Sequence, residues 1–262
     1  MSVILMRQHL RQEGFALLGW AVTVGILAFA VAVVFAILPP GFAHAMQPFM
    51  QRLPAGLNAF FGGLATVASM PGWVAGLSLS GFVPLAVTVF VALGALSLVV
   101  EDRDSGSLEF LLALPVRREG LLAARSVSLI LQILSLEAAV WLLSLAGAAA
   151  IGHALPAGRL AAALLLDVMA QTALAGTLAL LCLALRDPTQ AMLVCLALAL
   201  GLYLLPVFAP HTPVRFLSPF AYAHGAVFLT GGAFPLGHLV MLGLWTVGAF
   251  ALAVLLYART DA

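Results

Sequence analysis

The run FALLGWAVTVGILAFAVAVVFAIL, residues 15–38, decides the fold, because it contains no charged residue and is long enough to cross a lipid bilayer as a helix. About 20 apolar residues at 1.5 Å each span the hydrocarbon core. The rest of the chain agrees with this run, since 64% of the 262 residues are hydrophobic and only 8% are charged. So few charges cannot cover the surface of a water-soluble fold. The sequence therefore predicts an integral membrane protein.

Further apolar runs of similar length predict six transmembrane helices in one domain, residues 1–262. The runs are continuous and do not alternate, which indicates helices and excludes membrane strands. We therefore expect an all-α integral membrane protein. The expected spans are 15–38, 81–100, 127–151, 160–185, 191–208 and 239–257.

The arginines predict the orientation, because they are the strong cations of a chain that contains no lysine. If the N-terminus is cytoplasmic, all arginines except Arg52, Arg159 and Arg215 fall on the cytoplasmic side, as the positive-inside rule requires. Both termini are then cytoplasmic in a cell membrane, which we expect to be the inner membrane of a bacterium or archaeon. The aromatic-rich outer segments 39–80 and 209–237 are expected to form short re-entrant helices, and residues 7–13 an N-terminal interfacial segment.

Residues 101–126 form the one sizeable cytoplasmic loop, and its first part, EDRDSGSLEFLLALPVRREG, concentrates charge. Asp104 and Ser105 favour a helix start, leucines follow at helical spacing, and Pro115 ends the run. The sequence thus predicts a short amphipathic helix over 105–114. Either this helix packs its leucines against the membrane edge, or it docks onto a soluble partner.

The segment EDRDSGSLEFLLALPVRREGLLAAR, residues 101–125, resembles the signature of permease subunits of the type 2 (exporter) class of ABC transporters. It has the acidic start, the Gly-Ser-Leu-Glu step, the leucine run and the Pro-Val-Arg-Arg sequence in order. The resemblance implies a permease that pairs with a second copy, as a homodimer or a related heterodimer, and with a separate ABC ATPase subunit that receives the loop as a coupling helix. By that resemblance, the coupling residues are Glu101, Gly106, Ser107, Leu108, Glu109, Leu111, Leu112, Pro115 and Arg118.

The absence of lysine fits this division of labour. A Walker A loop needs the lysine of G-x-x-x-x-G-K-[ST] to reach the β- and γ-phosphates, so this chain cannot build one. We expect it to be a transporter subunit and no enzyme, with ATP and Mg²⁺ bound by the partner ATPase. No cofactor, metal site or nucleic-acid partner is expected in this chain. The cargo is not identified, although the few charges favour a lipophilic or amphipathic molecule.

Two acids, Glu137 and Asp167, fall inside predicted spans, where an acid disfavours insertion by about 2.5–3.5 kcal/mol. Counted from opposite ends of their helices, they reach roughly similar depth. With Gln132 and Gln171 they are candidates for a substrate cavity. The alternative is that each acid is protonated or hydrogen-bonded within its own bundle.

Two other classes of function remain open. A six-helix intramembrane protease would need a serine such as Ser80 in the SLSG sequence of residues 78–81, although the first glycine of the expected Gly-x-Ser-Gly pattern is replaced by Ser78. An ion-coupled secondary transporter would suit paired polar groups in mid-membrane, although no inverted repeat is visible. An ATPase bound to the purified protein would favour the ABC transporter over both.

Overall fold

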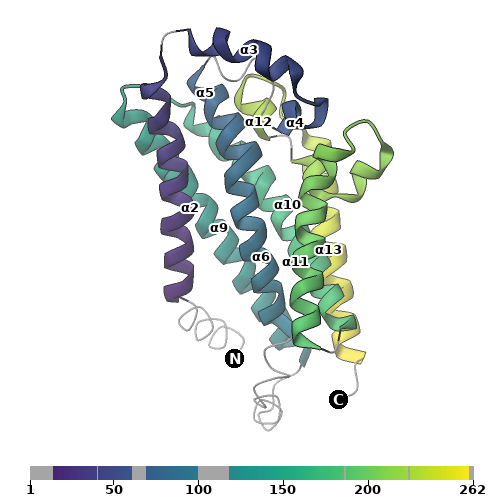
Figure 1. Ribbon diagram of the computed structural model, residues 1–262. Coiled ribbons are helices and arrows are strands. Elements are labelled where there is room, and N and C mark those ends of the chain that lie inside the picture. The colour runs from purple at the N-terminus through teal and green to yellow at the C-terminus, as the bar shows by residue number, and fades with distance from the viewer. Residues whose placement is uncertain are drawn as a thin grey trace.

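The computed structural model describes residues 14–39, 41–60, 69–99, 118–185, 187–223 and 225–259 (Figure 1). Within these ranges every regular element is a helix, and six helical segments are long and apolar enough to cross a membrane. The prediction of an all-helical protein with six spans is confirmed. The segments are Gly14–Ile37, Met70–Leu98, Gly120–Ala150, Ala157–Ala184, Pro188–Phe208 and Leu236–Ala258.

The six spans consist of the following helices. The first is α2 (Gly14–Val34) with a 3-10 turn, η1 (Phe35–Ile37). The second joins α5 (Met70–Trp73), the π-helix η2 (Val74–Phe82) and α6 (Val83–Val99). The others are α9 (Arg118–Ala150), α10 (Ala157–Ala184), α11 (Pro188–Phe208) and α13 (Leu236–Arg259).

Two of these helices begin much earlier than the sequence predicted, whereas the other four begin within three residues of the predicted start. The second span starts at Met70 and not at residue 81, because Ser69 caps it by accepting a hydrogen bond from the Gly72 amide at 3.2 Å. Pro71 in the first turn also favours a helix start. The third long helix starts at Arg118, so residues 118–126 of the expected loop are helical.

Short helices gather at one end of the bundle, which we call the short-helix end (Figure 1). The first residue of α2 and the last of α13 lie at the opposite end. The described parts of the segments 39–80 and 209–237 thus contain short helices, except that residues 70–80 belong to the second span. The short helices are α3 (Phe42–Arg52), α4 (Ala55–Phe60), η3 (Pro213–Leu217), η4 (Pro219–Tyr222) and α12 (Gly225–Leu229).

Helix α10 lies at the centre of the bundle, because 72% of its most apolar window is buried, against 22–28% for α2, α11 and α13. The outer helices leave large apolar side chains exposed, including Phe15 at 92%, Leu244 at 67% and Val247 at 69%. Such a surface would be unstable in water and is satisfied by lipid. The exposed faces therefore agree with a protein embedded in a bilayer.

Small residues bring the long helices together, as is typical of membrane bundles. A side chain at Gly147 of α9 would lie 2.9 Å from the Phe29 carbonyl oxygen of α2, and one at Gly176 of α10 would lie 2.9 Å from the Ala249 methyl group of α13. Larger residues at these positions would force the helices apart.

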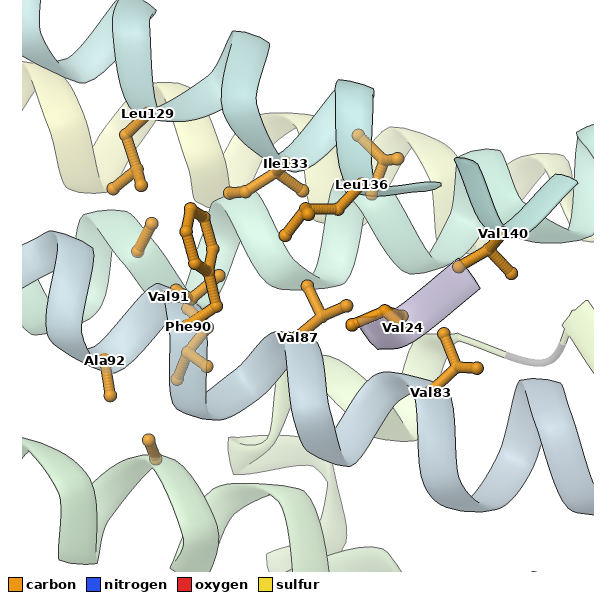
Figure 2. Close-up of a cluster of buried hydrophobic side chains, with 14 of the residues drawn as sticks. Val24, Val83, Val87, Phe90, Val91, Ala92, Leu129, Ile133, Leu136 and Val140 are labelled. Carbon is orange, nitrogen blue, oxygen red and sulfur yellow. The ribbon is translucent and has the colours of Figure 1, made fainter. Parts of the chain in front are cut away.

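Side chains from α2, α6 and α9 interdigitate in a region that we call the apolar core cluster (Figure 2). On α6 they recur every four residues, at Val83, Val87 and Val91, so one face of this helix turns toward α9. The cluster comprises Val24, Val83, Val87, Phe90, Val91, Ala92, Leu129, Ile133, Leu136 and Val140.

Candidate functional site

The structure brings together the two acids that the sequence placed at similar depth. Glu137 on α9 and Asp167 on α10 are only 3% and 7% exposed, and their carboxyl groups are close enough to interact. Glu137 follows Ile133 by one helical turn, so the acid pair borders the apolar core cluster. Two carboxyl groups side by side in apolar surroundings require positive charge or a shared proton.

The hydrogen bonds of this pair are incomplete. Among the described residues, Oε1 and Oε2 of Glu137 and Oδ2 of Asp167 are buried and have no partner at hydrogen-bond distance. The carboxyl groups lie near each other, yet not in a geometry that satisfies these oxygens. An orphaned buried oxygen is costly, so its presence here requires an explanation, of which a functional role is one.

The two glutamines of the predicted cavity have different surroundings. Gln171 is fully buried and joins α10 to α6: its Nε2 donates to the Pro84 carbonyl at 3.0 Å, and its Oε1 accepts from the Thr88 hydroxyl at 3.4 Å. Gln132 is 3% exposed on α9. Gln171 therefore holds two helices together, with its polar atoms occupied by them.

A cavity of about 380 Å³ lies between the long helices and the short-helix end. Its walls come from α4, η2, α6, α10, α11, η3, η4 and α12. Asp167 belongs to this wall, whereas Glu137, Gln132 and Gln171 do not. Of the four residues that the sequence predicted for a substrate cavity, one therefore lines this cavity.

Prolines shape the wall that α11 forms with the second span. Pro84 and Pro206 have no N–H, so neither can donate to the carbonyl four residues earlier in its helix. The Tyr203 hydroxyl donates to the Ser80 carbonyl at 3.1 Å, which is the carbonyl that Pro84 leaves without a donor, and to the Gly81 carbonyl at 2.6 Å. The Ser218 hydroxyl donates to the Leu202 carbonyl at 2.6 Å. The freed carbonyls thereby tie α11 to the π-helix and to η4.

Glycines let the short helices approach the long ones. A side chain at Gly225 of α12 would lie 2.7 Å from the Ala163 carbonyl oxygen of α10, and one at Gly56 of α4 would overlap the Val207 carbonyl of α11. Only glycine permits such a close approach of one backbone to another. These contacts hold α4 and α12 in the wall of the cavity.

One cation and two aromatic rings complete the wall. The Tyr203 and Phe220 rings meet edge to face, with centroids 5.2 Å apart. Arg215 donates from Nη1 to the Pro210 carbonyl at 2.7 Å and lies over the Phe216 ring at 4.6 Å. Asp167 lies ten residues into α10, about 15 Å from its start, whereas Arg215 belongs to η3 at the short-helix end.

The sequence prediction missed Tyr203, Arg215 and Phe220, which come from segments read only as a span and an outer loop. For Tyr203 a signal exists in Pro84, because a proline within a helix leaves the carbonyl four residues earlier to be satisfied by another donor.

The predicted coupling residues fall on a part of the chain that the structure does not describe. Glu101, Gly106, Ser107, Leu108, Glu109, Leu111, Leu112 and Pro115 lie outside the described residues, as does the segment 7–13. Arg118 opens α9, and nothing is described of its side chain. The end of α6 and the start of α9, which flank these residues in the sequence, lie at the end of the bundle opposite the short helices (Figure 1).

Ser80, the serine considered for proteolysis, donates its hydroxyl to the Ala75 carbonyl at 3.0 Å within the π-helix. Cys182 of α10 and Cys195 of α11 are buried, with their sulfur atoms 3.3 Å apart and not joined by a disulfide bond. Neither arrangement displays a nucleophile activated by a base within the described residues.

A scan against models of protein families and searches of curated proteins and of solved structures found no match to this chain. The fold and the buried acid pair therefore define its class from the structure alone: it is a multi-pass helical membrane protein. A cavity at one end of its six helices contains a buried carboxyl group.

Proposed function

We propose that the chain is the permease subunit of an ATP-driven exporter of the ABC type, acting as a dimer with a separate ATPase. The observation that carries the proposal is the segment 101–125, whose order of acidic, Gly-Ser-Leu-Glu, leucine and Pro-Val-Arg-Arg steps resembles the coupling region of such permeases. The six spans support it. In this proposal the short-helix end faces outward and both termini are cytoplasmic.

The packing of the helices suggests how a push on the loop would reach the cavity. The segment 105–114 lies between α6 and α9, and α9 packs against α2, α6, α10 and α13. Glu137 of α9 is next to Asp167, which lines the cavity. A shift of α9 driven by closure of the ATPase would therefore move the acid pair and open or close the cavity by alternating access.

Co-purification tests this proposal directly. The tagged chain is isolated from its own host in mild detergent, and its partners are identified by mass spectrometry and assayed for ATP hydrolysis. We expect a near-stoichiometric ATPase that is lost when Leu108 and Leu112 are both changed to Asp. Gly158→Asp is the control, because Gly158 is exposed at the start of α10, at the opposite end of the bundle.

Recovery of the chain alone, without ATP hydrolysis, would contradict the ABC proposal. If an ATPase is recovered, Glu101→Arg and Gly106→Val are expected to uncouple its activity from the permease. These two variants should leave the folding of the bundle unchanged, which size-exclusion chromatography checks.

The acid pair favours an ion-coupled secondary transporter as a second candidate. Paired carboxyl groups buried between spans are common in proton pathways. Proteoliposomes that contain the chain alone would then take up protons under a membrane potential, as followed with trapped pyranine. Flux that Glu137→Gln and Asp167→Asn both abolish would support this candidate, and flux equal to that of empty vesicles would exclude it.

A further inference from the structure

Asp167 is the starting point, because it is both buried and part of the cavity wall. The residue is 7% exposed, and its Oδ2 has no hydrogen-bond partner among the described residues. A carboxyl oxygen left in this state costs free energy that a positively charged hydrogen-bond donor would recover. A ligand that supplies such a donor would therefore complete the site.

Glu137 adds a second acid next to Asp167 and so increases the attraction of the site for a cation. Its carboxyl lies next to that of Asp167, is 3% exposed and does not line the cavity. A cation that entered the cavity would thus meet the field of two acids while touching one of them. In low-dielectric surroundings this field is stronger than it would be in water.

The remaining wall suits an apolar body with a cationic group. Tyr203 and Phe220 present aromatic rings, whose faces attract cations. Leu79, Val207 and Val227 provide apolar surface. The volume, about 380 Å³, lies in the range of small-molecule sites.

Arg215 is the charged group of the wall that opposes a cationic ligand. Its guanidinium is engaged with the Pro210 carbonyl and the Phe216 ring. It belongs to η3 at the short-helix end, whereas Asp167 lies deeper along α10. An anion would be drawn to Arg215 and an amine to Asp167, so the two ligand classes are separable by experiment.

We propose that this cavity binds a small amphipathic amine, with its ammonium group on Asp167 and its apolar body against Tyr203, Phe220 and the apolar wall. In the proposed exporter this amine would be the transported cargo. The inference rests on the proposed function only for the direction of transport. Binding itself needs no ATPase, so failure of the ATPase to co-purify and failure of amine binding are separate results.

The test uses three compounds that share one compact apolar cage: adamantylamine, adamantanol and adamantanecarboxylate. Each is titrated into the purified full chain in detergent by isothermal calorimetry. We expect adamantylamine to bind about tenfold or more tightly than adamantanol, since a charge-assisted hydrogen bond in a buried site exceeds a neutral one. Equal affinity for amine and alcohol would overturn the proposal, and this comparison requires no variant.

Asp167→Asn then locates the site. It should weaken adamantylamine by about tenfold and leave adamantanol unchanged, because only the charge is removed. The control is Asp187→Asn, which removes an exposed acid and preserves the cap of α11, where Asp187 accepts from the Gln190 amide at 2.7 Å. Unchanged amine affinity in Asp167→Asn would overturn the proposal. Tight binding of adamantanecarboxylate that Arg215→Gln abolishes would also overturn it, in favour of an anion site.

Discussion

The apolar core cluster and the cavity at Asp167 lie on adjacent faces of the same helix, and they are built in opposite ways. Val83 and Val87 of α6 pack into the cluster, with 1% and 0% exposure. Pro84 follows Val83 and Thr88 follows Val87, and both form hydrogen bonds with Gln171 of α10. The cluster is filled by aliphatic and aromatic side chains (Figure 2), whereas the cavity contains unfilled volume and an unpaired carboxyl oxygen.

This difference indicates which region supports stability and which is available for function. In a bilayer the helices gain little from the hydrophobic effect, so close packing and interhelical hydrogen bonds must hold them. The cluster supplies that packing. The cavity wall carries features that weaken a bundle: a π-helix, two prolines in helices and Asp167, one acid of the buried pair. Such features persist where a ligand or a motion makes use of them.

The largest effect is expected in the cluster. Leu136→Ala should lower the free energy of unfolding by about 2–5 kcal/mol, because a fully buried leucine leaves a void that its neighbours cannot fill. Thermal unfolding in detergent measures the change. Leu131→Ala is the control on the same helix, since Leu131 is 41% exposed toward lipid. Equal losses in the two variants would mean that the cluster is not the main source of stability.

A smaller loss is expected where α12 closes the cavity. Gly225→Ala places a methyl group 2.7 Å from the Ala163 carbonyl oxygen, and relief of this overlap should cost about 1–3 kcal/mol. Since Ala226 and Val227 line the cavity, the change should also alter ligand affinity. Gly201→Ala of α11, where a side chain meets nothing within 4 Å, is the control. A variant as stable as the control would show that α12 is free to move away from α10.

A loss of stability of similar size is expected when the hydrogen bonds between α11 and the π-helix are removed. Tyr203→Phe removes the donor from the carbonyls of Ser80 and Gly81, and should cost about 1–3 kcal/mol because the buried acceptors lose a partner. Tyr222→Phe removes a weaker bond of 3.3 Å to the Phe216 carbonyl near the surface and should cost less. Unfolding temperatures of the two variants give the comparison. A larger loss in Tyr222→Phe would contradict this account of the cavity wall.

The sequence predicted the cluster better than the cavity, for a physical reason. Continuous apolar runs reveal spans because lipid imposes one requirement on a whole helix, and six of them were found. The depth of Glu137 and Asp167 followed from helix rise alone. Arg215 and Phe220 could not be placed in the cavity wall, because their position depends on how the short helices pack on α10 and α11. The start at Met70 was missed because residues 70–80, which include Gly72 and Gly76, were assigned to the outer segment 39–80.

The smallest expected change in stability has the opposite sign. Asp167→Asn should raise the free energy of unfolding by about 1 kcal/mol, because the amide replaces a buried charge beside Glu137 and its NH₂ group can donate to a Glu137 oxygen. Glu137→Gln should act in the same direction. The two gains should not add in the double variant, since either change alone relieves the contact between the acids.

This double-mutant cycle separates the two regions by the sign of the effect. Truncation of a side chain in the cluster lowers the free energy of unfolding, whereas removal of one acid should raise it. Thermal unfolding of the wild type, the two single variants and the double variant provides the four values. Additive gains would mean that the acids are independent of each other. A loss of stability in Asp167→Asn would mean that the carboxyl group holds the helices together, and the cavity would then be a structural feature as much as the cluster is.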